Sequence, residues 1–564
     1  MKFRALVDEL LAEYFRLDPV HATDIGHHQY DGLWPDMTDA GRAARLAFAD
    51  GALERLRGID PTTLTRDDRI DHRILVGAAD AMRFNEGTLQ EERWNPLVFV
   101  YMFGNGLFAL LARPFAPLPE RLRSAAARLR GLPAAIDAAR ATLSEPGERP
   151  VAEFHTQKAI ERLTGIGNLA DSLVAEAAKV EDPAVQAELR TELEAAAAEA
   201  KEALDAFGTW LRDELLPTAT GDFRLGSALY RAKFRHALRV EMEPSELRER
   251  ALGAFEVVRS EMQRLARELW PAWKGKEPMP DNPDLAVRAV LDAIAADHPA
   301  ADELLEYCRA ENERIEAFCR EIGLIGLADE PLEIMWTPEF MRSFGGAMLI
   351  PPGPLDRGLS SFFAITPMPD DWTDEQRASY LREDNARMLR LLTIHEAVPG
   401  HYLQLAYSNR CPSLVRAIFQ SGVFAEGWAV YVTQVMMDVG YGADDPALML
   451  VHWKFYLRAI TNTMMDIAIH TGAMEREEAM KLMVEQGFQE ESEAAAKWDR
   501  ARLSSTQLCE YFLGYTEITE LEREKRRRAQ AEGTSFRWRP FLESVLAHGT
   551  PPTPVIRDIL FGGA

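Results

Sequence analysis

Residues 393–404, TIHEAVPGHYLQ, contain the side chains with the clearest chemistry in the chain. His395 and Glu396 are adjacent, and His401 follows in the same apolar segment. Two imidazoles can bind a divalent metal ion, and a neighbouring carboxylate can accept a proton from a water that the ion activates. In the familiar His-Glu-x-x-His motif the histidines are four residues apart. His395 and His401 are six apart, so a shared metal requires an irregular backbone between them.

The residues between the histidines predict that irregularity. In a regular helix, six residues correspond to about 600° of rotation and roughly 9 Å of rise, so the two imidazoles would point in different directions. Pro399 lacks the amide that would bond the carbonyl of His395, and it disfavours a helical Val398. Gly400 permits dihedral angles that other residues avoid. We therefore expect a break at Pro399–Gly400 that brings both imidazoles to one point.

Glu426 is the best third ligand, 25 residues beyond His401 in the apolar segment FAEGWAVYVTQVMMD. A buried carboxylate needs a partner, and a cation is a suitable one. Catalytic zinc usually takes three protein ligands, so His395, His401 and Glu426 predict one Zn²⁺ ion, with Glu396 as general base. The same donors also suit iron(II). Histidines that merely fill a core are the alternative that the spacing alone leaves open.

The motif HEAVPGHYLQ, followed by FAEGWAVY, resembles the signature of the bacterial family catalogued as domain-of-unknown-function family 885. That signature runs approximately His-Glu-x-x-Pro-Gly-His-x-x-Gln and then Glu-Gly-Trp-Ala, and the family is placed among zincin-like metallopeptidases. The resemblance extends along most of the chain. Further similar segments are HATDIGHHQYDGLWPD from residue 21, GGAMLIPPGP at 345–354 and DRARLSSTQLCEYFLGY at 499–515.

The resemblance implies a mainly α protein, with a large helical zincin-like body around a deep cleft, broadly like angiotensin-converting enzyme. It implies the same three metal ligands and Glu396 as the base. Peptide hydrolysis also develops negative charge on the carbonyl oxygen, which needs preorganised donors beside the metal. The positions that the resemblance offers as catalytic donors are Tyr511, His470 and Arg502.

Three positions depart from the family pattern. The C-terminal segment lacks a proline before Gln507, Asn462 stands where arginine is expected, and Met348 occupies a strand position that is often tyrosine. Asp466, four residues before His470, is expected to orient that imidazole across one helical turn. These departures bear on substrate choice and leave the ligand set intact.

The elements that position these residues are predicted to be mostly helices. Residues 1–330 form a predicted N-terminal helical lobe, and residues 331–564 a zincin-like catalytic lobe, the two lobes making one compact body. Helical patterns cover residues 2–16, 39–57, 67–84 and 118–143. Three long helices are predicted after Asp182-Pro183, from about Pro244 to Trp270, and from about Pro283 to Cys319.

A small β-sheet is predicted immediately before the metal-site helices. Residues 331–369 contain short β-type runs split by glycine and proline, PLEIMWTPEF, FGGAMLIPP and SSFFAITP, which indicate about three strands. An exposed strand edge at this position could hold an extended peptide by main-chain hydrogen bonds, although a simple cap on the helices fits the pattern equally well. Metal-site helices are expected over 373–440 and C-terminal helices up to residue 564.

Composition limits the partners. The formal net charge is −25, which disfavours nucleic acid and anionic membranes as partners because both attract basic surfaces. The four cysteines have no CxxC spacing and suggest buried thiols in a reducing compartment. No apolar run reaches membrane-spanning length, and the first residues read as an amphipathic helix rather than a signal peptide. We therefore expect a cytoplasmic protein.

Two functions follow from these observations. The first is a zinc-dependent hydrolase of amide bonds, acting on short peptides or small amides through a metal-activated water and Glu396. The second is a non-catalytic helical protein that retains the fold and binds a peptide or small molecule. The presence of Glu396 and of all three candidate ligands favours the enzyme. The sequence does not indicate an oligomeric state.

Overall fold

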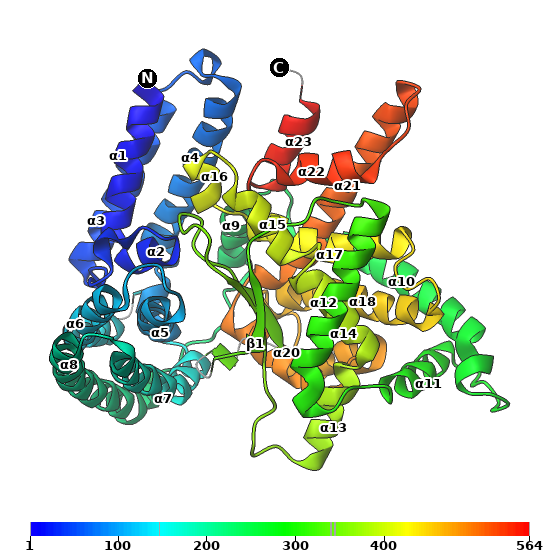
Figure 1. The fold of residues 1–564 in the computed structure, drawn as a ribbon, viewed down its shortest axis with the longest axis horizontal. Helices are drawn as coiled ribbons and strands as arrows, with labels where there is room; N and C mark the ends of the chain where they lie inside the picture. The colour runs from blue at the N-terminus through cyan, green and yellow to red at the C-terminus, as the bar shows by residue number, and fades with distance from the viewer. Residues whose placement is uncertain (1, 146, 339–340, 343–345, 563–564) are drawn as a thin grey trace. The chain divides into compact units, whose positions relative to one another are not determined.

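The computed structural model describes residues 2–145, 147–338, 341–342 and 346–562. The fold is mainly helical, as predicted, with one small sheet (Figure 1). The chain forms two compact units. Unit 1 comprises Met1–Phe223 with Pro352–Ser360, and unit 2 comprises Arg224–Pro351 with Ser361–Ala564.

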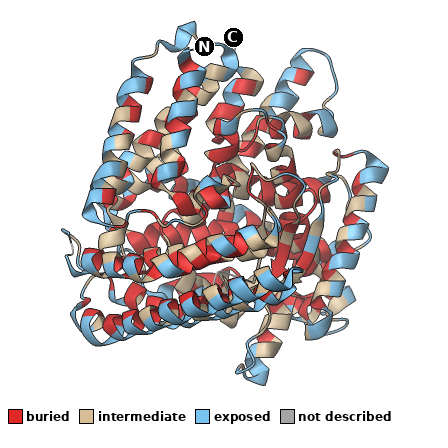
Figure 2. Ribbon diagram, turned by 60° about the vertical axis from the view of Figure 1, so that its left-hand side comes forward, coloured by how far each residue is buried: buried red, intermediate tan, exposed pale blue. Residues whose placement is uncertain are grey.

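Unit 1 contains eight α-helices among its described residues. They are α1 (Lys2–Leu17), α2 (Pro19–Asp24), α3 (Asp39–Arg57), α4 (Arg66–Phe84), α5 (Leu97–Ala112), α6 (Leu118–Ser144), α7 (Glu153–Glu176) and α8 (Pro183–Trp210). The predicted start of α8 is confirmed: the Asp182 side chain accepts hydrogen bonds from Ala184 N and Val185 N, at 2.8 and 3.2 Å. Buried and exposed positions form separate stripes along the long helices (Figure 2), as expected for amphipathic helices that share a core.

The segment Pro352–Ser360 belongs to unit 1 although it lies between two strands of unit 2. Leu355 N donates to Ile25 O at 2.9 Å, and Asp356 accepts from His28 Nε2 at 3.1 Å. The His28 imidazole also contacts Asp31 and stacks on Phe115, with ring centroids 3.7 Å apart. His28 therefore lies between two carboxylates, Asp31 and Asp356, and holds the segment through Asp356.

Unit 2 contains the helices of the predicted site. They are α9 (Ser227–Leu238), α10 (Pro244–Trp273), α11 (Pro283–Ala295), α12 (Leu304–Ile322), α13 (Asp374–Glu383), α14 (Ala386–Glu396), α15 (His401–Asn409), α16 (Leu414–Ile418), α17 (Gly422–Asp438), α18 (Pro446–His470), α19 (Arg476–Met480), α20 (Glu491–Leu503), α21 (Glu510–Ala531), α22 (Trp538–Leu546) and α23 (Thr553–Phe561).

The division between the units lies after Phe223, whereas the sequence analysis divides the lobes at residue 330. α9 to α12 pack into unit 2; α10, for example, packs against α18, and α12 against α14. The prediction of a single helix from Pro283 to Cys319 is wrong, because this segment forms two helices, α11 and α12. Pro299 explains the interruption, since it has no amide to donate and disfavours a helical His298.

The predicted sheet of about three strands is confirmed. Its strands are β1 (Leu332–Trp336), β2 (Ala347–Ile350) and β3 (Ser361–Ile365), in the order β1-β3-β2. β3 pairs in parallel with β1 and antiparallel with β2, so β2 forms an edge. The predicted runs at 331–340 and 344–352 include residues 339–340 and 344–345, which lie outside the described residues.

The sheet packs against the helix that carries the site. Phe363 and Ile365 of β3 form one buried cluster with Cys308 of α12 and with Leu389 and Ala397, which lie on and just after α14. Burying these apolar side chains fixes α14 against the sheet. β2 also contacts α14 directly. The edge strand is therefore held beside the segment that contains His395 and Glu396.

A close crossing of α17 and α21 fixes the other side of the site. A Cβ added to Gly427 would lie 2.3 Å from the backbone of Gly514, so the two helices touch backbone to backbone. Glycine at both positions permits this approach, because any side chain would separate the helices. The crossing places Glu426, next to Gly427, close to the start of α21.

The described residues also bear on two smaller predictions. All four cysteines are buried thiols, as predicted, and burial raises the pKa of both Cys308 and Cys319 to about 12. No single described helix has the length and apolar character needed to cross a membrane. One bent pair, Arg66–Arg93 with Leu97–Ala112, meets these criteria by length and composition only.

Candidate metal centre

α14 ends within the predicted motif. The helix begins at an Asn385 cap, whose side chain accepts from Arg387 N and Met388 N, and it runs to Glu396. Residues 397–400 are non-helical, and α15 begins at His401. The predicted break at Pro399–Gly400 is therefore present. The break places His395 on α14 and His401 on α15. The directions of the two imidazoles are therefore not fixed by the geometry of one continuous helix.

Two contacts hold the break in place. A Cβ on Gly400 would lie 1.9 Å from His395 O, so only glycine fits against the end of α14. Trp428 Nε1 on α17 donates a hydrogen bond to Pro399 O at 2.9 Å. The Trp428 side chain is fully buried. The tryptophan of the Glu-Gly-Trp-Ala motif thus attaches α17, which carries Glu426, to the kink between the histidines.

The break brings the three predicted ligands together. His395 Nε2 and His401 Nε2 lie 3.8 and 3.3 Å from Glu426 Oε2. One candidate ligand atom from each residue lies within 4.8 Å of the others, and no other such group occurs in the described ranges. His401 and Glu426 keep 12% and 20% of their side-chain surface exposed, so solvent can reach the site.

The donor set fits a divalent cation. Glu426 Oε2 and His395 Nδ1 are buried atoms without a hydrogen-bond partner among the described residues, and a buried carboxylate oxygen in that state is costly unless a cation or proton is present. Two imidazoles and one carboxylate form the ligand set of several catalytic zinc sites. The arrangement therefore has the composition, the spacing and the unsatisfied atom that a metal ion would require.

The electrostatic environment favours a neutral His395 imidazole and an ionised Glu426 carboxylate, which are the protonation states that bind a metal ion. Burial, with the charge of His401, lowers the pKa of His395 to about 3, so its imidazole is neutral. Burial opposes ionisation of Glu426, but the adjacent His401 and His395 outweigh it and lower the pKa of this carboxyl. Burial also opposes the charged form of His401, yet Glu426 raises its pKa. His401 and Glu426 therefore each favour the charged form of the other, and a bound cation would take the place of the imidazolium charge.

Glu396 is the last residue of α14 and lies beside the ligands. Its side chain is buried, and burial raises its pKa to about 7, although His401 and a hydrogen bond from the Leu349 amide oppose the shift. Leu349 belongs to the edge strand β2. A carboxyl with a pKa near neutrality can accept and release a proton at physiological pH, which is the property of a general base.

The three predicted donors have different positions. Tyr511 OH accepts a hydrogen bond from Gln507 Nε2 at 3.3 Å, and burial together with the Glu426 charge raises the pKa of its hydroxyl. His470 instead directs Nε2 at Ala501 O and Ser504 O, both at 2.9 Å, so this nitrogen holds the end of α20. The structure brings Tyr511 into the electrostatic field of the ligands and uses His470 as a support.

A second arginine, Arg500, also acts on the ligands. Arg502 pairs with Asp499 and lies over the Trp498 ring, 5.4 Å from its centroid. Arg500 donates to Gln507 Oε1 at 3.2 Å; its charge helps to lower the pKa of Glu426 and opposes the raised pKa of Tyr511. The catalytic role expected for Arg502 stays a prediction. The segment DRAR offers two arginines about 200° apart on a helix, and only packing decides which one faces the site.

Asp466 supports the same segment, but not through His470. Its Oδ1 accepts from Tyr230 OH at 2.6 Å and from Thr506 N at 2.9 Å. Thr506 has a φ of +71°, a strained conformation for a β-branched residue. The carboxylate thus holds the turn before Gln507 and Tyr511. Tyr230 on α9 had no sequence signal, because its role depends on a contact across more than 200 residues.

Comparisons with known proteins agree with this fold. The model of the family described as "Bacterial protein of unknown function (DUF885)" matches residues 19–560. A solved structure described as a "putative lipoprotein of unknown function" from Shewanella oneidensis is 31% identical, with a TM-score of 0.81 and 99% of each chain covered. The crystal structure of the "putative lipoprotein" from Colwellia psychrerythraea is 17% identical, with a TM-score of 0.78, covering 98% of this chain and 97% of that one.

No curated protein matches the chain. The family model, in contrast, spans nearly the whole sequence, including His395, Glu396, His401 and Glu426. One solved relative also exceeds 30% identity over almost its entire length. The chain therefore belongs to the family of bacterial proteins of unknown function designated DUF885.

Proposed function

We propose that this protein is a zinc-dependent hydrolase of peptide bonds that acts on short peptides. The observation that carries the proposal is the convergence of His395, His401 and Glu426 on one point, with Glu396 beside them. Two imidazoles and a carboxylate hold the ion. When bound, zinc supplies Lewis-acid polarisation of a carbonyl and lowers the pKa of a coordinated water. The proposal includes a zincin-like fold with a deep cleft at these ligands.

The protein groups have distinct roles in this proposal. Glu396 accepts a proton from the attacking water at its carboxylate and later returns it to the leaving amine, which its pKa of about 7 favours. Tyr511 donates its hydroxyl proton in a hydrogen bond to the carbonyl oxygen, where negative charge develops. Gln507 Nε2 donates to that hydroxyl at 3.3 Å and so orients it, and Arg500 holds Gln507 by donating to its Oε1 at 3.2 Å.

The edge strand β2 supports an extended substrate. Among the described strands, β2 pairs only with β3, and the Leu349 amide of β2 hydrogen-bonds the Glu396 carboxyl. A peptide that added to this edge would place its backbone beside the base, with main-chain hydrogen bonds supplying affinity and little side-chain selectivity. Short, extended peptides are therefore the proposed substrates.

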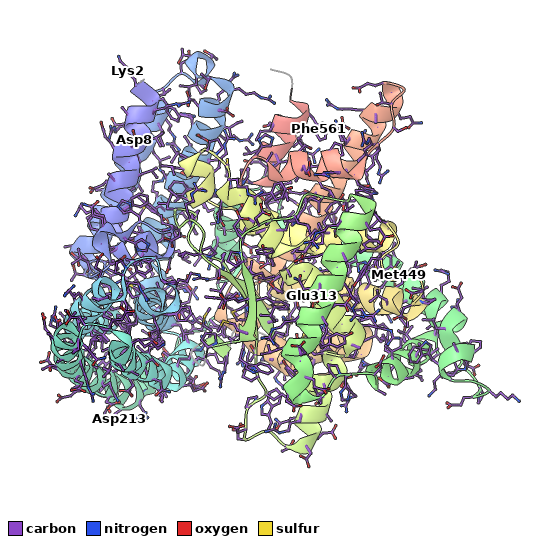
Figure 3. All side chains as sticks on the ribbon, in the orientation of Figure 1. Lys2, Asp8, Asp213, Glu313, Met449 and Phe561 are labelled. Carbon is purple, nitrogen blue, oxygen red and sulfur yellow. The ribbon has the colours of Figure 1, made fainter. Side chains whose placement is uncertain are left out.

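The test is metal analysis combined with hydrolysis of a mixed peptide library, read by mass spectrometry. We expect one zinc per chain, cleavage that a chelator abolishes and zinc restores, and a fall in kcat of about 10²- to 10⁴-fold in Glu396→Gln. Glu313, an exposed glutamate of α12 (Figure 3), provides a matched control, Glu313→Gln, which should retain full activity.

A non-catalytic binding protein is the alternative. It predicts a metal-free protein that binds peptides without cleaving them, and binding that Glu396→Gln leaves unchanged. Purified protein that remains without zinc after incubation with the ion, or cleavage that survives in Glu396→Gln, would contradict the proposed hydrolase. Retained zinc with cleavage that depends on Glu396 would exclude the alternative.

A further inference from the structure

Three basic side chains lie close to one another, and two of them act on the candidate metal ligands, in a protein whose formal net charge is −25. They are Arg458 on α18 and Lys497 and Arg500 on α20. The two helices contact each other within unit 2. We refer to these three residues as the basic cluster.

The basic cluster borders the ligands on two sides. The Arg458 guanidinium lies 5.9 Å from the centroid of the Phe455 ring, and that ring is 5.5 Å from the His395 imidazole. Arg500 lies on the Glu426 side, where its charge acts on this carboxylate and on Tyr511. Lys497 precedes Arg500 by three residues and so shares its face of α20. The two arginines therefore act on different members of the candidate ligand set, Arg458 on His395 and Arg500 on Glu426.

Neighbouring carboxylates are shared between the cations. Glu493 lies 3.7 Å from both Arg458 and Lys497. Glu383 pairs with Arg458 and, at 2.8 Å, with Lys454. Asp384 also acts on Arg458, and Glu510 acts on Arg500, but burial raises the pKa of these two carboxyls to about 7 and about 8, which reduces their negative charge at neutral pH. The repulsion among these cations contributes to a lowered pKa for Lys497, after burial.

The cations remain accessible to a ligand. The side chains of Arg458 and Lys497 expose 17% and 19% of their surface, so they are partly desolvated yet reachable. In such an environment an incoming anion is attracted more strongly to the cations than at a fully hydrated surface, because water screens their charges less. A ligand ammonium group would be repelled at the same place. The site is therefore suited to a negatively charged group close to the metal.

We propose that the basic cluster binds a carboxylate of the peptide substrate, adjacent to the bond that is cleaved. This inference rests on the proposed peptidase function and specifies its substrate class. The carboxylate has two sources, the free C-terminus of the peptide or an acidic side chain next to the scissile bond. Water adds across the C–N bond, its oxygen joining the carbonyl carbon and a proton passing to the nitrogen. The fragment that leaves carries the bound carboxylate.

Matched peptides distinguish these sources. One neutral peptide sequence is prepared with a free C-terminal acid, with a C-terminal amide, and as an amide with glutamate as its last residue. A charge-assisted contact predicts a kcat/KM about 10- to 100-fold higher for the acid than for the neutral amide. If the glutamate amide also showed the higher kcat/KM, an acidic side chain would be a second source of the carboxylate. If it did not, the site would accept only the free C-terminus of the peptide.

A substitution connects the preference to the cluster. Lys497→Met should reduce the acid-to-amide ratio of kcat/KM by about tenfold or more, through a higher KM for the acid. Lys481 is an exposed lysine of the same unit, and Lys481→Met should leave the ratio unchanged. Calorimetric binding of the acid and the amide to Glu396→Gln gives a readout that does not depend on turnover, and the acid should bind more tightly by a similar factor.

The outcomes separate this inference from the proposed function. Zinc-dependent and Glu396-dependent cleavage of acid and amide at equal rates would overturn the carboxylate site and leave the peptidase intact. Tighter binding of the acid to Glu396→Gln, lost in the double variant with Lys497→Met, would support the carboxylate site even if the wild-type protein cleaved nothing. If the acid were neither cleaved faster nor bound more tightly than the amide, the carboxylate site would be overturned.

Discussion

Gly400 provides the most direct test of the geometry at the metal centre. In Gly400→Ala, the new Cβ would lie 1.9 Å from His395 O and 2.3 Å from Ile394 O. These are backbone atoms, which cannot rotate away as a flexible side chain could. Real Cβ contacts rarely fall below 3.0 Å, so the backbone must move by about 1 Å. That displacement occurs between the two histidines that are proposed to share one ion.

The magnitude follows from the tolerance of metal ligation. Ligand distances in metal sites hold to about 0.2 Å, several times less than the forced displacement. Disturbing a group that merely supports a ligand typically costs about 10- to 100-fold in affinity, so displacing His401 itself should cost at least about 100-fold, or about 2.7 kcal/mol. The crowding should also lower the free energy of unfolding by about 1 to 3 kcal/mol.

Zinc competition with a chromophoric chelator measures the affinity, and urea unfolding measures the stability. Gly253→Ala is the matched control, because its added Cβ meets nothing within 4 Å inside the exposed part of α10. Alanine there should leave zinc affinity unchanged and stabilise the helix by about 0.5 to 1 kcal/mol. If Gly400→Ala bound zinc as tightly as wild type, the break would not be what positions the histidines.

Two further predictions concern the groups around the break. Trp428→Phe removes the hydrogen bond to Pro399 O and should cost about 1 kcal/mol of stability, with about 10- to 100-fold weaker zinc binding. Trp453→Phe, which removes an indole N–H that has no hydrogen-bond partner among the described residues, should change neither; equal effects of the two substitutions would contradict the role of Trp428. In zinc-free protein, Glu396 has a pKa of about 7 instead of the usual 4.5. The protonated Glu396 carboxyl therefore contributes fully to the free energy of unfolding below pH 4.5. This contribution, about 3 kcal/mol, is lost as the pH rises toward 7. Urea unfolding across this range should show a smaller loss in Glu396→Gln, and identical pH profiles would refute the shift.

Local chemistry determined much of the fold and of the candidate centre. Asp182-Pro183 fixed the start of α8, because the cap and the proline act within one helical turn. Pro399 and Gly400 predicted the break between α14 and α15 for the same reason. The types of the donor residues were also evident. Such features depend on neighbours in the sequence, so they can be predicted without the rest of the fold.

Positions that depend on packing could not be predicted in this way. Arg500 and Arg502 both occur in DRAR, and the contacts of α20 decide that Arg500 faces Glu426. His470 was expected at the substrate, but its imidazole holds Ala501 O and Ser504 O instead. Helical periodicity gives the angle between two side chains and not the direction in which the helix is rotated.

The sequence by itself determined that a His-Glu pair, a second histidine and a downstream glutamate lie on a broken helical motif, because the break and the donors are local properties of the chain. The tertiary structure alone decided that His395, His401 and Glu426 meet within 4.8 Å. It also decided that the chain divides after Phe223 and that Arg458 comes to lie near Lys497. These outcomes arise from contacts between residues far apart in sequence, whose energies are set by the packing of whole helices.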